Sequence, residues 1–409
     1  MTSTDSHLIK NERIDVVTGE AQAAASPPDS VINEKYIKGE VRIVTEQARY
    51  PLNTIASMVE DKGYKLSPEY QRRHRWSVEK QSRLIESLIM NVPVPPIFLY
   101  EYEYSKYEVM DGLQRLTALH DFYRDKIRLE GLDQWPELNG KTYSELPEKV
   151  REGIDRRYLS SVILLKETAK SSEEALRLKQ MVFERINSGG VKLEPQEARN
   201  AILDGPMNQK CMELSRNEVL CRLWGIPQPD EQEINGGPPS QERIENEDYR
   251  TMADVELVLR FFAYRQKHRL HKSGESLGTY FNNYLRHANS FPNETINTLG
   301  DIFEKTIQLA EDIFGEKAFW LFRKRERGSE EHWRWLERPA ISVYEPLMRV
   351  LSEKLENAQE LKERKNIILG GMEDFYRNRY GAFEGRNVNP SALTAREDAY
   401  RELLSSVLD

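Results

Sequence analysis

The 409-residue sequence lacks most features that mark secreted, zinc-binding or membrane proteins. It has two cysteines, Cys211 and Cys221, and no second pair, which excludes a disulfide framework and a cysteine-based zinc site. No apolar run approaches the roughly 20 residues that a membrane-spanning helix needs. The polar first 30 residues have no apolar stretch typical of a signal peptide. We therefore expect a cytoplasmic protein with no membrane contact.

Basic residues are also fewer than acidic residues in this sequence. There are 67 Asp and Glu against 59 Lys and Arg, and this formal net charge of −8 argues against a protein that coats nucleic acid nonspecifically. Any contact with DNA must be local, and two basic runs are candidates. Ligand phosphate is the favoured partner of the first run, which comprises Arg72, Arg73, Arg75, Lys80 and Arg83. The second run, Arg323–Arg327, follows four apolar residues and suits either DNA contact or a solvated helix end.

Composition and periodicity divide the chain into three parts. Residues 1–45 are predicted to be a disordered arm, residues 46–205 an α+β domain and residues 206–409 an all-helical domain. An acidic, Gly- and Pro-rich segment at residues 226–248 is predicted to be a mobile loop. In the last part, helices are expected over Tyr249–Lys267, Thr295–Phe314, Val343–Leu355 and Leu361–Arg379.

Two polar, arginine-bearing clusters stand out because the patterns around them are typical of a hydrophobic core. The first, residues 68–76, precedes an amphipathic helix expected over Val78–Met90. The second begins where a strand expected over Lys106–Met110 passes through Asp111-Gly112 into another amphipathic helix. The predicted order is loop, helix, strand, hairpin, strand and helix.

The strand-to-helix junction suits a phosphate group. The first amides of a helix have no internal partners and carry the positive end of the helix dipole, so they can bind an oxyanion. Gly112 would let a phosphate approach the backbone, and Arg115 offers a planar fork for its oxygens. Asp111 can cap the helix or hold a divalent cation, and Gln114 suits the orientation of a water. The plainer alternative is that Asp111 is only a cap and Arg115 only a solvated side chain.

Taken together, these segments resemble the N-terminal domain family of the GmrSD-type restriction systems, within the ParB and sulfiredoxin-like superfamily. The resemblance rests on Pro68–Arg72 with Trp76, on the proline-rich strand entry Val92–Leu99 and on Asp111–Leu119. Phe183–Gly190 and Leu193–Ala201 resemble the family's next signature, so the similarity covers roughly residues 50 to 205. The implied fold is a ParB/sulfiredoxin-like α+β domain, here followed by helices.

One residue departs from the family pattern. Leu113 stands where the family has the first of two glutamines. If this position faces the core the change is silent, and if it faces ligand it weakens hydrolysis while leaving binding intact. A sulfiredoxin activity is excluded, because that chemistry needs a cysteine in this turn and Leu113 is no nucleophile.

The resemblance implies a nucleoside triphosphate and Mg²⁺ at this turn. Under it, Asp111 holds the metal, Gly112 and the helix amides cradle phosphate, Gln114 positions water, and Arg72 and Arg115 neutralise charge developing in phosphoryl transfer. Tyr70 or Trp76 would stack on the base, although a core position is favoured for Trp76. The predicted catalytic residues are Asp111, Gln114, Arg115 and Arg72, and the predicted nucleotide-binding residues are Tyr70, Gln71, Arg72, Gly112, Arg115 and Asn187.

Relatives often carry a fused His-Asn-His nuclease domain. The seven scattered histidines and the lack of an Asp-His dipeptide indicate that this chain has none. We therefore predict a nucleoside triphosphatase of a prokaryotic anti-phage restriction system that contacts DNA through local basic patches and works with a nuclease on another chain. Two alternatives stay open: a DNA-binding sensor with a degenerate nucleotide site, and a metal-dependent DNA nuclease. The nucleotide's base and the oligomeric state stay open as well, a homo-oligomer included.

Overall fold

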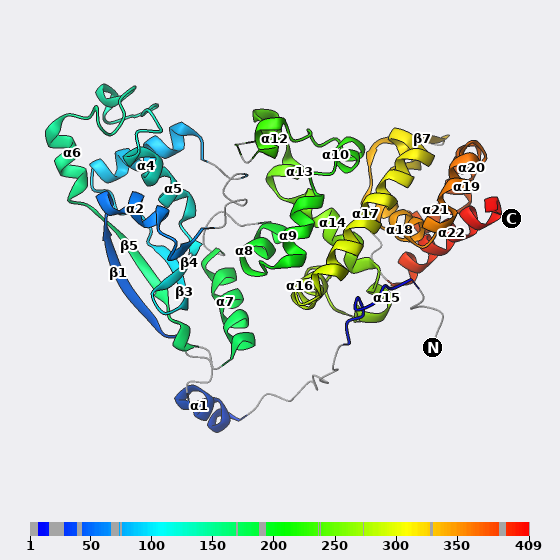
Figure 1. The fold of residues 1–409 in the computed structure, drawn as a ribbon, viewed down its shortest axis with the longest axis horizontal. Helices are drawn as coiled ribbons and strands as arrows, with labels where there is room; N and C mark the ends of the chain where they lie inside the picture. The colour runs from blue at the N-terminus through cyan, green and yellow to red at the C-terminus, as the bar shows by residue number, and fades with distance from the viewer. Residues whose placement is uncertain are drawn as a thin grey trace. The chain divides into compact units, whose positions relative to one another are not determined.

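A computed structural model of the chain contains two compact units. It describes residues 7–15, 28–38, 43–66, 73, 76–168, 171–187, 194–235, 237, 239–272, 274–327, 330–383 and 390–408. Thr18–Ile202 form the first unit, called the α+β unit below (Figure 1). Met1–Val17 and Leu203–Asp409 form the second, called the helical unit.

The α+β unit is built on a mixed five-stranded sheet, which confirms the predicted fold class. Its strands are β1 (Thr45–Pro51), β2 (Tyr64–Lys65), β3 (Ile97–Glu103), β4 (Lys106–Asp111) and β5 (Tyr158–Leu164), in the spatial order β1-β5-β3-β4-β2. β3 pairs antiparallel with β4 and parallel with β5, while β1 runs antiparallel to β5. The short β2 pairs parallel with β4. β4 is therefore an inner strand, and the chain leaves it directly into a helix.

Helices α2, α4 and α5 are grouped beside this sheet (Figure 1). The helices of the unit are α1 (Asp29–Lys38), α2 (Ile55–Glu60), α4 (Val78–Ile89), α5 (Leu113–Tyr123), α6 (Glu148–Asp155), α7 (Ser172–Asn187) and α8 (Pro195–Ile202), with 3-10 turns at Leu52–Thr54, Pro136–Leu138 and Lys166–Thr168. α4 and α5 confirm the two amphipathic helices predicted from periodicity. α5 packs between α2 and α4, and a largely aliphatic core that includes Ile85, Leu99, Leu116 and Ile163 fills the space between helices and sheet.

The helical unit surrounds one long central helix, α17 (Asn293–Phe314). The others are α9 (Pro206–Leu214), α10 (Glu218–Trp224), α11 (Glu231–Ile234), α12 (Gln241–Glu245), α13 (Glu247–Arg250), α14 (Ala253–Tyr264), α15 (Lys267–Leu270), α16 (Leu277–Ala288), α18 (Ile341–Ser352), α19 (Ala358–Glu363), α20 (Lys365–Asn378), α21 (Tyr380–Phe383) and α22 (Pro390–Leu408), with 3-10 turns at Gly315–Lys317 and Leu355–Asn357. The four predicted helices correspond to α14, α17, α18 and α20, although a turn at Met252 separates α13 from α14. None of the described helices has both the length and the apolar character needed to cross a membrane.

The prediction that this second part is all helical was incomplete. A two-stranded antiparallel hairpin, β6 (Trp320–Arg327) and β7 (Glu330–Pro339), interrupts the helices, and the basic run Arg323–Arg327 lies on β6 and not on a helix end. Phe322 stands opposite Trp335, with ring centroids 5.2 Å apart, and also stacks on Trp333 at 5.7 Å. Cross-strand aromatic pairs of this kind stabilise a hairpin against the helical alternative.

Two segments predicted to lack order instead carry structure. Residues 7–15 lie against the helical unit, where Glu12 is fully buried beside Arg265, and α1 forms within the rest of the predicted arm. The acidic segment 226–248 contains α11 and α12, joined by a buried ion pair with 2.9 Å between Glu233 Oε2 and Arg243 Nε. Both corrections have the same cause: charged residues that look solvated in the sequence pair with distant or neighbouring partners and are buried together.

Candidate functional site

The candidate site lies where β4 ends and α5 begins. Gly112 joins them in a left-handed conformation, with φ 93° and ψ 10°. A Cβ atom at this position would lie 2.4 Å from Ile97 Cγ2 on β3, which is far inside the contact distance of two carbon atoms. Both the backbone and the neighbouring strand therefore require a glycine here. The glycine alone does not indicate a ligand.

Asp111 and Arg115 lie together at this junction. Arg115 Nη2 donates to Asp111 Oδ2 at 2.7 Å and to the Pro96 carbonyl at 3.2 Å. The two side chains are 36% and 14% exposed respectively, and the Nε atom of Arg115 is buried without a hydrogen-bond partner among the described residues. Both hydrogen bonds of Arg115 come from Nη2, so its Nη1 group can donate to a further anionic oxygen.

The plainer interpretation of this turn was wrong in both respects. The N-cap of α5 is Gly112, and no side chain caps the helix, so Asp111 is not a cap. Arg115 is largely buried and is not a solvated side chain. By helix geometry the first amides of α5 have no intrahelical partner, and they lie on the same turn as Arg115.

Gln114 has a contact that the sequence did not predict. Its Oε1 accepts the backbone N–H of Trp76 at 3.1 Å, while Gln81 Nε2 donates to the Trp76 carbonyl at 2.9 Å. The Lys80 ammonium lies 4.8 Å from the centroid of the Trp76 ring. Two glutamine amides therefore fix the last residue of the first polar cluster at the start of α5. The oxygen of Gln114 therefore takes part in this clamp.

The clamp also reveals a site residue missed from the sequence. Gln81 is buried on the inner face of α4, where the apolar pattern hides it, and its Oε1 has no hydrogen-bond partner in the described part of the chain. A buried polar residue on an otherwise apolar helix face is the signal that could have indicated it. Trp76 itself is half-buried, so the predicted core position is only partly met.

Leu113 faces the core. Its side chain is 9% exposed, on the side of α5 that also buries Leu116 and Leu119. This is the case in which we expect the departure from the family pattern to leave hydrolysis unchanged.

The remaining predicted residues are only partly covered by the structure. Tyr70, Gln71 and Arg72 lie outside the described residues, as does the side chain of Asn187, the last residue of α7. In the first basic run, Arg73 is 3% exposed and therefore does not form part of an exposed basic patch. The exposed Arg83 pairs with Glu79 at 2.9 Å.

An ion pair connects α7 to the strand that carries the site. Lys179 Nζ on α7 lies 2.7 Å from both carboxylate oxygens of Glu108 on β4, and the two side chains are largely buried. Glu108 is three residues before Asp111, so the contact fixes α7 beside the strand that ends in the site. No spacing rule indicated this pair, because its partners are far apart in the sequence.

Other arrangements of polar residues have structural roles. His120 contacts Asp121 at 2.9 Å and Glu60 at 3.3 Å, and Arg124 pairs with the same glutamate, which joins α5 to α2. Within the described parts of the chain, no group of three or more His, Cys, Asp or Glu side chains is placed to hold a metal ion. The turn at Asp111–Arg115 is therefore the strongest candidate site on the described surface.

Comparison with known proteins identifies a family for most of the α+β unit. Neither a curated protein nor a solved structure matches the chain. The family described as "GmrSD restriction endonuclease, N-terminal domain" matches residues 54–203, a range that contains the clamp, the Asp111–Arg115 turn and α7. The α+β unit of this chain therefore belongs, over residues 54–203, to the N-terminal domain family of the GmrSD restriction endonucleases.

Proposed function

We propose that the Asp111–Arg115 turn binds the phosphates of a nucleoside triphosphate and hydrolyses it as part of a DNA restriction system. The observation that carries the proposal is Arg115 on the first turn of a helix: its side chain is 14% exposed, and its hydrogen bonds to Asp111 and Pro96 both come from Nη2, which leaves Nη1 for a phosphate oxygen. Free helix amides and an adjacent arginine are the two donors that bind phosphate best. The restriction context is supported by the family to which the unit belongs.

The residues at the turn also fit a magnesium ion. Mg²⁺ in nucleotide sites is held by one or two carboxylates together with phosphate oxygens and waters, and Asp111 is a carboxylate of this kind, 36% exposed. When bound, the ion would supply charge neutralisation on the phosphates. Asp111 would hold it, and Arg115 would meet the negative charge that develops on the transferred phosphoryl group.

The glutamine clamp has a positioning role in this proposal. By fixing Trp76 at the start of α5, Gln114 and Gln81 bring the end of the segment that contains Tyr70, Gln71 and Arg72 to the same turn. Arg72 would add a second positive charge, and Tyr70 would stack on the base. These two roles, and that of Asn187, are proposals drawn from the family resemblance.

Phosphate release from each of the four nucleoside triphosphates, with Mg²⁺ and with or without DNA, tests the proposal. Asp111→Ala and Arg115→Ala should each reduce the rate by about 100-fold or more, because they remove groups that act on transition-state charge. Arg128→Ala is the matched control, since Arg128 pairs with Glu145 at 2.8 Å on an exposed face of the same unit. If both site variants hydrolyse nucleotide at the wild-type rate, the site is misassigned. Binding without hydrolysis would favour the alternative of a DNA sensor with a degenerate site.

We further propose that DNA cleavage requires a nuclease on another chain. The purified protein with Mg²⁺ or Mn²⁺ should then leave plasmid DNA intact. Nicking that Asp111→Ala abolishes would establish a single-chain nuclease that uses this turn. Nicking that survives this substitution would place the activity elsewhere in the preparation or in the chain.

A further inference from the structure

Residues 7–15, called the N-terminal segment below, are held by side chains of the helical unit. Arg265 and Gln266 lie between α14 and α15, Arg269 lies on α15, and Thr295 lies on α17. Each of the four contacts the segment, and the residues in contact are about 250 or more positions apart in the sequence. The segment itself contains no helix or strand.

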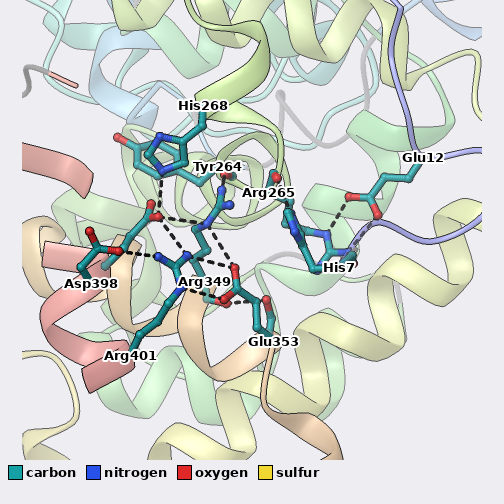
Figure 2. A network of polar contacts seen from close by, with 11 residues as sticks. His7, Glu12, Tyr264, Arg265, His268, Arg349, Glu353, Asp398 and Arg401 are labelled. Atoms are coloured by element: carbon teal, nitrogen blue, oxygen red, sulfur yellow. Dashed lines mark hydrogen bonds and ion pairs between the residues drawn. The ribbon is translucent and has the colours of Figure 1, made fainter. Parts of the chain in front are cut away.

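A glutamate is the centre of the contact. Arg265 Nε and Nη2 lie 2.7 and 2.9 Å from the two carboxylate oxygens of Glu12, and Nη2 also donates to the His7 carbonyl at 2.7 Å (Figure 2). The side chains of Glu12 and Arg265 are 0% and 1% exposed. Because the arginine donates to both carboxylate oxygens, the contact requires a charged glutamate in one particular orientation. Neither aspartate nor glutamine at position 12 can reproduce it.

The helical unit also forms hydrogen bonds with the backbone of the segment. Gln266 Nε2 donates to the Glu12 carbonyl at 2.7 Å, and Gln266 Oε1 accepts the Ile14 N–H at 3.1 Å. Arg269 Nη2 donates to the Ile14 carbonyl at 2.6 Å, and the Ile14 side chain is 5% exposed. The Gln266 amide therefore both donates to and accepts from the backbone of the segment, as a neighbouring strand would.

The segment is separated in the sequence from the rest of the helical unit. On its C-terminal side the chain continues into the α+β unit, and the remainder of the helical unit begins at Leu203. No helix or strand of the helical unit continues into it, so its release would not unravel one. The two units are linked both at Ile202–Leu203 and through the docked segment, and release would leave only the first link.

We propose that Arg265, Gln266 and Arg269 form a peptide-recognition site for a Glu-x-Ile segment, and that residues 7–15 occupy it in cis as a releasable strap. The ligand class follows from the contacts: one carboxylate, one aliphatic side chain two residues later and the backbone between them. Docking closes a second connection between the units, and undocking opens it.

The test uses the full chain with a protease recognition sequence inserted between Thr18 and Gly19. After cleavage, retention of the N-terminal fragment is followed by gel filtration and mass spectrometry. The wild-type fragment should stay bound at micromolar protein concentration, and the Glu12→Gln variant should release its fragment at least tenfold faster. Lys10→Gln is the control, because Lys10 is exposed and contacts the helical unit through its backbone carbonyl, which the substitution keeps. Rapid loss of the wild-type fragment, or equal retention in both variants, would overturn the proposal.

Two further measurements separate the proposal from its alternatives. A labelled peptide of residues 6–17 should bind the chain from which the fragment has been removed. The Glu12→Gln peptide should bind more weakly, by the same factor by which the Glu12→Gln fragment is released faster. Light scattering of the uncleaved protein should give a monomer at every concentration at which the fragment is retained. A dimer that Glu12→Gln dissolves would place the segment on a second copy and overturn the assignment in cis.

Discussion

The two proposed sites, one in each unit, use an arginine–carboxylate pair in opposite ways. In the α+β unit, the side chains of the Arg115–Asp111 pair are 14% and 36% exposed. In the helical unit, the side chains of the pairs Arg265–Glu12 and Arg243–Glu233 are each at most 2% exposed. A pair that solvent still reaches can take a further ligand, whereas a sealed pair holds two segments of the chain together.

The cores of the units differ in a related way. The α+β unit is packed with aliphatic side chains, whereas the helical unit buries several tyrosines. Tyr280 donates to the Ala263 carbonyl at 2.6 Å and Tyr344 to the Leu257 carbonyl at 2.9 Å, and burial raises the pKa of both phenols. These hydroxyls join neighbouring helices and have no access to solvent. They belong to the fold and not to a reaction.

The largest expected effect that tests this comparison is a loss of stability when Arg243 is replaced. Arg243→Ala removes the nearer of two arginines from Glu233, which is 2% exposed and keeps Arg216 at 3.9 Å, so it should lower the free energy of unfolding by up to about 3–5 kcal/mol. Denaturant unfolding followed by circular dichroism measures it. In Arg222→Ala, the control, the lost pair with Glu311 is half-exposed and the expected cost is below about 1 kcal/mol. Equal losses in the two variants would contradict the distinction between sealed and exposed pairs.

A smaller effect is expected at Leu113, the residue that departs from the family pattern. Leu113→Gln restores the family residue but places an amide in the core, so it should destabilise the protein by about 2–4 kcal/mol and leave nucleotide turnover no higher. Leu113→Met keeps the volume and should cost less than about 1.5 kcal/mol. Turnover that rises in the glutamine variant with an unchanged melting temperature would show that this side chain faces ligand.

The smallest effect concerns the pH dependence of strap docking. Burial lowers the pKa of His7 below its usual 6.5, with Arg349 and Arg265 acting in the same direction and the Arg265 carbonyl and Glu353 opposing them. The docked state therefore favours the neutral imidazole, whose Nε2–H donates to the Arg265 carbonyl at 2.7 Å. Docking should be strongest above pH 6.5 and weaken as the pH falls, because the released segment takes up the proton first.

Fragment retention after cleavage, measured between pH 7.5 and 5.5, tests this sign. His7→Gln, which keeps a hydrogen-bond donor but does not titrate, should flatten the dependence. Retention that improves on acidification in the wild type would mean that the docked state prefers the charged imidazole.

Local periodicity was sufficient to predict the scaffold of the site. Helices α4 and α5 and the strands between them follow from apolar spacing within single segments, and Asp111 and Arg115 meet because they are four residues apart on one turn. The contacts between distant segments could not be predicted, because no local signal records them. The Gln114–Trp76 clamp, the Lys179–Glu108 pair and the burial of Glu12 are of this kind.

The hairpin β6–β7 was missed for a different reason. Its first strand is rich in arginine, which suits a helix end equally well, and the alternation that identifies a strand lies in Trp333 and Trp335 on the second. The pairing of these rings with Phe322 favours the hairpin, and that pairing exists only once the two strands meet.

The central claim is that Arg115 at the start of α5 binds the phosphates of a nucleotide, and calorimetric titration tests it most directly. Nucleoside triphosphates with Mg²⁺ are titrated into the wild type, Arg115→Ala and the control Arg128→Ala. Loss of a charge-assisted phosphate contact of about 1.5–3 kcal/mol should weaken binding roughly 10- to 150-fold in Arg115→Ala and leave the control unchanged. Equal dissociation constants for the wild type and Arg115→Ala would contradict the assignment of the turn as the nucleotide site.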